Sequence, residues 1–149
     1  MQNRIEIKNS IAYLMNITNN TLKNYIYQKF KAEGLDVTHD MWIVLNKLCL
    51  KDGQNQQEIA NSCDKDKSTI CRIVDNLIKR NLAIRASDKI DRRNNLIFLT
   101  NKGKEIQDKL LPIVFETLIQ AQNDISEHEL ECAKSVLTKI LQNLLKKED

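Results

Sequence analysis

The 149-residue sequence has little glycine or proline: three glycines and one proline in the whole chain. A β-sandwich or a β-barrel needs many tight turns, which these residues usually supply, so their scarcity favours long helices joined by short loops. A chain of this length can build one hydrophobic core and is too short for two domains of ordinary size. We therefore expect a single, mainly α-helical domain.

The sequence also lacks a long hydrophobic run. No apolar stretch approaches the roughly 18 residues that a membrane-spanning helix requires, and the N-terminus lacks the basic start and apolar stretch of a secretory signal. We expect a cytoplasmic protein with no membrane partner.

Residues suited to catalysis or metal binding are few. His39 and His128 are the only histidines, and neither a glycine-rich phosphate loop nor a recognisable nucleophile is present, so we do not expect an enzyme. The spacing of the four cysteines matches neither a CxxC redox pair nor a zinc site, which predicts reduced thiols, no metal and no cofactor. Cys49 and Cys63 fall on apolar stripes and are expected in the core.

Positive charge is concentrated in one part of the chain. Residues 64–104 contain 11 Lys and Arg against 5 Asp, whereas the other residues contain 12 basic and 15 acidic side chains. A local basic surface of this kind is typical of a nucleic-acid contact.

The apolar spacing predicts a long helix over residues 5–31, a second helix after Thr38, a short third helix opened by Asn55 and a fourth over residues 66–80. Two β-rich runs, 82–86 and 95–99, indicate a hairpin with a charged tip. A further helix follows Thr100, and Ser126 opens the last one. Residues 35–103 thus form a winged helix-turn-helix, flanked by helices in 1–34 and 104–149 that we expect to pair with a second copy of the chain.

The predicted fourth helix has an apolar face and a polar face. The second helix of a helix-turn-helix places its N-terminal residues against base edges in the major groove. Here these positions are occupied by Lys67, Ser68, Thr69 and Arg72. Arg72 is long enough for a bidentate contact with guanine.

The tip of the predicted hairpin carries Arg92 and Arg93 beside Asp91. A guanidinium suits a narrow, electronegative minor groove, and a neighbouring carboxylate can orient it. We therefore expect Arg93 to enter the minor groove and Asp91 to brace it.

Residues 35–103 resemble the DNA-binding core of the MarR (multiple antibiotic resistance regulator) family of transcriptional regulators. The resemblance is carried by DKST at residues 66–69, Asp91-x-Arg93, and LTNKG at residues 99–103. It implies a homodimer that binds duplex DNA at a pseudo-palindromic operator. Two departures stand out: Asn81 occupies a usual glycine position, where it can adopt positive φ, and Lys65 replaces an apolar residue and could contact a phosphate.

The resemblance further implies a repressor that a small lipophilic or aromatic effector releases from DNA. Tyr13, Tyr25, His39 and Trp42 lie on helices that would line such a site. Two alternatives remain open: a thiol-based redox-responsive regulator of the same fold, and a winged-helix protein-interaction module.

Overall fold

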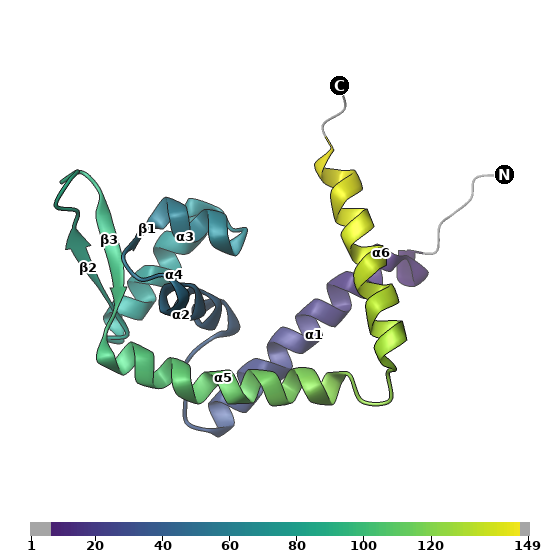
Figure 1. The fold of residues 1–149 in the computed structure, drawn as a ribbon. Coiled ribbons are helices and arrows are strands. Elements are labelled where there is room, and N and C mark those ends of the chain that lie inside the picture. The colour runs from purple at the N-terminus through teal and green to yellow at the C-terminus, as the bar shows by residue number, and fades with distance from the viewer. Residues whose placement is uncertain (1–6, 147–149) are drawn as a thin grey trace. The chain divides into compact units, whose positions relative to one another are not determined.

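The computed structural model describes residues 7–146, and within them the chain forms six α-helices and three short strands (Figure 1). The mainly α-helical fold with a small β wing is the predicted one. The chain divides into two compact units, Met1–Phe115 and Glu116–Asp149, and helix α5 (Asn101–Ala121) crosses the boundary between them. No helix in the described part of the chain is long and apolar enough to cross a membrane.

Helix α1 (Ile11–Ala32) begins later than the sequence predicts. A separate 3-10 turn, η1 (Ile7–Asn9), precedes it, and residues 5 and 6 lie outside the described residues. The break occurs at Ser10, whose extended backbone and side chain cap the helix by accepting a hydrogen bond from Tyr13 N at 3.2 Å. The predicted helix over residues 5–31 is therefore wrong at its start, whereas its end is confirmed to within one residue, and Gly34 follows it with φ +73°.

Three helices form the helix-turn-helix: α2 (His39–Leu50), α3 (Gln56–Cys63) and α4 (Lys67–Lys79). Each begins at the residue that the sequence indicates, because Thr38, Asn55 and Asp66 each accept a backbone hydrogen bond from three residues on. Their apolar sides form one core with several side chains fully buried: Val44, Leu45, Leu48, Ile59, Ile70, Val74 and Leu77.

The wing is formed by strands β2 (Ala83–Ser87) and β3 (Asn95–Leu99), which pair antiparallel with Ala83 opposite Leu99. A third strand that the sequence does not predict, β1 (Gln54–Asn55), pairs with the other edge of β3, giving the order β1-β3-β2. Two residues are too few to show an alternating pattern, so β1 has no sequence signal of its own.

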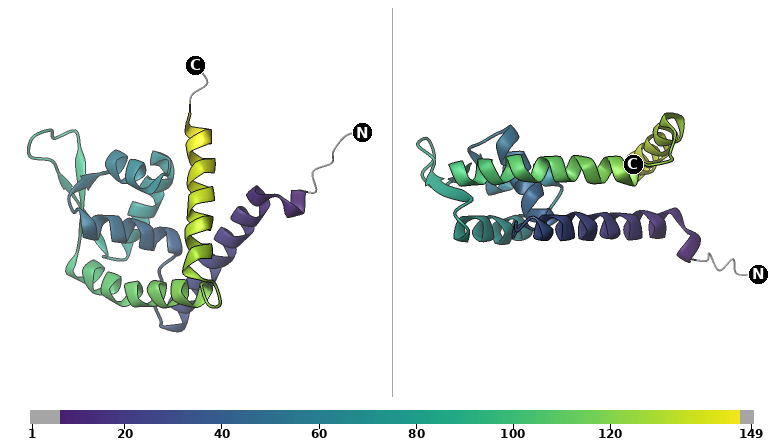
Figure 2. Two further views of the ribbon diagram at one scale, coloured as in Figure 1. Left: turned by 45° about the vertical axis from the view of Figure 1, so that its right-hand side comes forward. Right: turned by 90° about the horizontal axis from the view of Figure 1, so that it is seen from below.

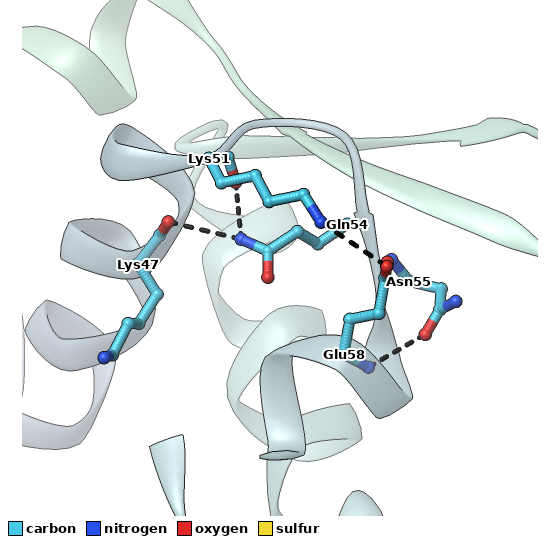
Figure 3. A network of polar contacts seen from close by, with 5 residues as sticks. All are labelled: Lys47, Lys51, Gln54, Asn55 and Glu58. Atoms are coloured by element: carbon cyan, nitrogen blue, oxygen red, sulfur yellow. Dashed lines mark hydrogen bonds and ion pairs between the residues drawn. The ribbon is translucent and has the colours of Figure 1, made fainter. Parts of the chain in front are cut away.

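A polar network joins strand β1 to the end of α2 (Figure 3). Gln54 is only 4% exposed, and its side-chain amide donates hydrogen bonds to Lys47 O at 3.2 Å and to Lys51 O. Lys47 O also accepts the backbone N–H of the C-cap residue Lys51 at 3.0 Å, so the Gln54 amide adds a side-chain donor to the carbonyl groups at the end of α2. The base of the wing is thereby fixed to the helix-turn-helix.

The start of α5 packs closely against the turn that follows α4. Thr100 Oγ1 caps the helix by accepting from Gly103 N at 2.9 Å, and it also donates to Asn81 O at 2.7 Å. A Cβ atom added at Gly103 would lie 2.1 Å from Leu82 O. Asn81 adopts φ +58°, which confirms that it takes the positive φ of the usual glycine.

The C-terminal unit consists of the end of α5 and helix α6 (Glu127–Leu145). The helix begins after Ser126, as predicted, and Ser126 and Glu129 form a capping box: Glu129 N donates to Ser126 Oγ at 3.3 Å, and Ser126 N donates to Glu129 Oε2 at 2.8 Å. None of the residues of α6 is buried, although its sequence is strongly amphipathic.

Candidate nucleic-acid interface

The first turn of α4 is fixed by its cap. Asp66 accepts hydrogen bonds from the backbone N–H and the hydroxyl of Thr69, both at 2.7 Å. These two bonds, with a smaller contribution from the charge of Arg72, lower the pKa of Asp66. The carboxylate therefore stays ionised and holds the start of the helix in one geometry.

The predicted reading face of α4 is exposed at Lys67, Ser68 and Arg72. Thr69 is half-buried and its hydroxyl donates to Asp66, so its oxygen remains as an acceptor. The opposite face is buried in the helix-turn-helix core through Ile70 and other apolar residues. The helix thus separates packing residues from polar residues as the sequence predicts.

Lys65 lies in a different environment from the other predicted DNA-binding residues. Its side chain is largely buried, and its Nζ lies 3.2 Å from Asp40 Oδ1. The same oxygen is 3.9 Å from Lys23 Nζ on α1 and 4.0 Å from His39 Nδ1. Lys65 therefore links the turn before α4 to α2 and α1, and its contact with a phosphate stays a prediction.

The tip of the wing carries the contact expected between Asp91 and Arg93. Arg93 Nε donates to Asp91 Oδ1 at 3.1 Å and Arg93 N donates to the same oxygen at 3.1 Å. These bonds lower the pKa of Asp91, the side-chain bond most. The Arg93 side chain nevertheless remains 90% exposed, and Arg92 is also exposed. The guanidinium is thus oriented by a charged partner and still accessible from solvent.

Ion pairs that the sequence did not reveal connect α4 to its surroundings. Arg85 on β2 donates to Asp75 on α4 at 2.8 Å, and this bond joins the wing to α4. Arg80 pairs with Asp36 before α2. The charges are visible in the sequence, but their pairing depends on the fold because the partners lie 10 and 44 residues apart.

Two of the four predicted effector-site residues are in contact. The ring centroids of His39 and Trp42 lie 5.5 Å apart, and the two ring planes are tilted by 53°. Among the described residues, His39 Nδ1 and Trp42 Nε1 are buried atoms with no hydrogen-bond partner. Tyr13 and Tyr25 lie twelve residues apart on α1, about 18 Å along the helix axis.

The cysteines differ from the expectation in one respect. Cys49 is exposed, because it faces away from the core next to buried Leu48, so its placement in the core is wrong. Cys63 is half-buried, and burial raises the pKa of its thiol. Cys71 on α4 donates to Gln56 on α3 at 3.1 Å. Within residues 7–146, no group of three or more His, Cys, Asp or Glu side chains is placed to hold a metal ion.

Comparison with known proteins shows the family resemblance clearly. No protein-family model matches the chain. The matched chain in the crystal structure of the S. aureus MepR–DNA complex is 27% identical in sequence, with a TM-score of 0.80 over 91% of this chain and 96% of that one. A MarR-family regulator from Rhodococcus sp. RHA1 is 25% identical, with a TM-score of 0.74 over 87% and 91% of the two chains.

A third structure shows the fold alone because its identity is lower. The transcriptional repressor CouR bound to a 23-mer DNA duplex is 20% identical, with a TM-score of 0.80 over 91% of this chain and 95% of that one. The chain therefore has the winged helix-turn-helix fold of the MarR-type transcriptional regulators, and the resemblance seen in the sequence is confirmed.

Proposed function

We propose that this protein is a sequence-specific, homodimeric regulator of transcription that binds duplex DNA, and that it is not an enzyme. The observation that carries the proposal is the exposed, capped N-terminus of α4 next to a wing with a braced, accessible arginine. The similarity to a DNA-bound MarR-type regulator supports it. Its place of action would be the cytoplasm, with the DNA.

Recognition would divide between bases and phosphates. Arg72 reaches a guanine edge in the major groove, and Ser68 and Thr69 approach neighbouring bases or phosphates closely because their side chains are short. Lys67 and Arg92 contact phosphates, and Lys65 does so if it exchanges Asp40 for DNA. Arg93 enters the adjacent minor groove, where the electronegative potential favours a guanidinium.

A homodimer is supported by apolar side chains that a single chain leaves uncovered. Helix α6 exposes Val136, Leu137, Leu141 and Leu144, and the N-terminal half of α1 exposes Leu14 and Ile17. Soluble monomers rarely expose contiguous apolar surface of this kind. Two-fold pairing through these faces would give two recognition helices about 10 base pairs apart on a pseudo-palindromic operator.

Regulation would follow from the spacing of the two recognition helices. A dimer bound at an operator obstructs polymerase, which makes the protein a repressor. A small lipophilic or aromatic acid releases it only if it binds more tightly to a dimer whose recognition helices are wrongly spaced. The buried, unpaired N–H of Trp42, next to His39, supports an effector with a hydrogen-bond acceptor.

The proposal is tested by incubating the purified full-length protein with a pool of random duplexes and sequencing those that it retains. We expect enrichment of an inverted repeat. On that selected duplex, Arg72→Ala should relax the preference for one guanine, whereas Lys67→Ala should weaken binding to all sequences equally. Failure to enrich any duplex would overturn the proposal and favour the protein-interaction alternative.

A second arm separates the effector proposal from a redox one. Aromatic acids should release the duplex from the wild-type protein and act more weakly on Trp42→Phe, which keeps an aromatic side chain, although a smaller one, and removes the indole N–H. If mild oxidation releases the duplex instead, and Cys71→Ser or Cys132→Ser prevents this, the thiol-based alternative replaces the effector proposal.

A further inference from the structure

The tip of the wing exposes one large apolar side chain between charged residues. Ile90 is 97% exposed, the highest value among the large apolar side chains of the described residues, and it lies between Lys89 and the Asp91–Arg93 pair. Leaving an isoleucine in water forgoes the free energy that its burial would release. A side chain in this position gains most if the wing contacts a surface that covers it.

The backbone around Ile90 is held by hydrogen bonds within the tip. Ile90 N donates to Asp88 Oδ1 at 2.9 Å, Asp88 N to Asn94 O at 2.9 Å, and Asn94 N to Asp91 O at 2.9 Å. The same Asp91 orients Arg93 through its carboxylate. Ile90 and Arg93 are therefore presented by one closed turn, so that whatever binds Arg93 is brought next to Ile90.

The charge of the tip indicates what would cover Ile90. Lys89, Arg92 and Arg93 outnumber the carboxylates of Asp88 and Asp91, so the tip has a net positive charge, and Asp91 is paired with Arg93. Such a surface is complementary to the phosphates that line a DNA groove. Proteins that enter the minor groove often insert an apolar side chain at a base step beside their arginines and partly unstack it.

We propose that Ile90 is an apolar wedge of the wing, which inserts at a base step of the minor groove beside Arg93. This proposal depends on the proposed DNA binding. The wedge would make affinity depend on how easily the step deforms, so that flexible TA or CA steps are favoured over a stiff A-tract at the wing contact. The wing would then contribute sequence preference without a hydrogen bond to a base.

The test compares Ile90→Ser with Ile90→Leu, which keeps the apolar bulk, on two forms of the selected duplex. The forms differ only in having TA or AA at the wing contact, and a 2-aminopurine at that step reports unstacking. We expect Ile90→Ser to weaken binding to the TA duplex about tenfold, a size typical of burying one apolar side chain. It should also lose the preference for TA and the rise in 2-aminopurine fluorescence.

Two controls separate the wedge from other effects. Arg93→Ala should reduce the salt dependence of binding by about one unit of slope, whereas Ile90→Ser should leave that slope unchanged. Leu50→Ser, which alters an exposed apolar residue outside the wing, should bind both duplexes like the wild type.

The outcomes distinguish this proposal from the one on which it depends. If the wild-type protein binds the selected duplex and Ile90→Ser retains both its affinity and its preference for TA, the wedge is wrong and DNA binding stands. If the wild-type protein binds no duplex, both proposals fail.

Discussion

The helix-turn-helix and helix α6 are both amphipathic in sequence but differ in burial. Helices α2, α3 and α4 bury most of their apolar side chains within one chain, including Leu48 and Leu77, and Leu50 at the end of α2 is an exception. Helix α6 buries none of its residues, and Leu141 is 56% exposed. The helices of the first region thus cover one another's apolar side chains, whereas α6 leaves its apolar face exposed.

Helix α1 combines both behaviours along its length. Its C-terminal end buries Ile26 and Phe30, and its N-terminal half leaves Leu14 and Ile17 exposed. The change from buried to exposed apolar side chains thus occurs within one helix. Amphipathic periodicity predicts that a face will be covered, but it does not tell whether the same chain covers it.

The largest effect should come from shortening a side chain in the core of the helix-turn-helix. Leu48→Ala removes a fully buried side chain from α2 and should lower the free energy of unfolding by about 2–5 kcal/mol, measured by urea denaturation. Leu50→Ala in the same helix, where the side chain is 76% exposed, should change it by less than about 0.5 kcal/mol. Equal effects at the two positions would contradict the assigned core.

The next effect concerns the face of α6. Leu141→Asp places a carboxylate in the proposed dimer interface and should weaken self-association at least about a hundredfold, because a buried unpaired charge costs about 3 kcal/mol or more. Asn143→Asp adds the same charge on the opposite side of the helix and should leave the mass of the sedimenting dimer unchanged. Sedimentation measures both, and a dimeric Leu141→Asp protein would show that α6 pairs differently or not at all.

A smaller effect is expected at Gly103, where the start of α5 packs closely against Leu82. Gly103→Ala brings a methyl group against Leu82 O and should lower the free energy of unfolding by about 1–3 kcal/mol, although alanine favours helices more than glycine does. Thermal unfolding checks this, with exposed Lys104→Ala as the control. A stabilised Gly103→Ala protein would mean that α5 and Leu82 separate easily.

The smallest effect is a pH dependence at the junction of α1 and α2. Burial and the charges of Lys23 and Lys65 lower the pKa of His39, and Asp40 only partly opposes them. The folded state therefore resists protonation, so the free energy of unfolding should fall as the pH drops from about 7 to 5. His39→Gln should flatten this slope, with His128→Gln as the control, and an unchanged slope would show that His39 is not its source.

Local features of the fold could be predicted from the sequence, and long-range ones could not. Thr38, Asn55, Asp66 and Ser126 cap the expected helices because capping depends on residues three positions apart. Strand β1, in contrast, could not be predicted. Its register with β3 depends on residues about 40 positions away.

The candidate site divides in the same way. The Asp91–Arg93 contact was predictable because the residues are neighbours, and so was the exposed side of α4, from its periodicity. The close approach of Leu82 O to Gly103, which requires a residue without a side chain, depends on how α5 packs and has no signal in the local sequence. The phosphate contact of Lys65 is a prediction from the resemblance and the charge, whereas its pairing with Asp40 depends on how α2 packs beside the turn.

Hydroxyl-radical footprinting on the selected duplex would show whether two copies of α4 and of the wing bind one duplex together. We predict two symmetric protected stretches with centres about 10 base pairs apart, flanked by minor-groove protection that Arg93→Ala removes. A single protected stretch for each bound protein, or flanks that Arg93→Ala leaves unchanged, would show that two copies of α4 and of the wing do not bind the duplex together.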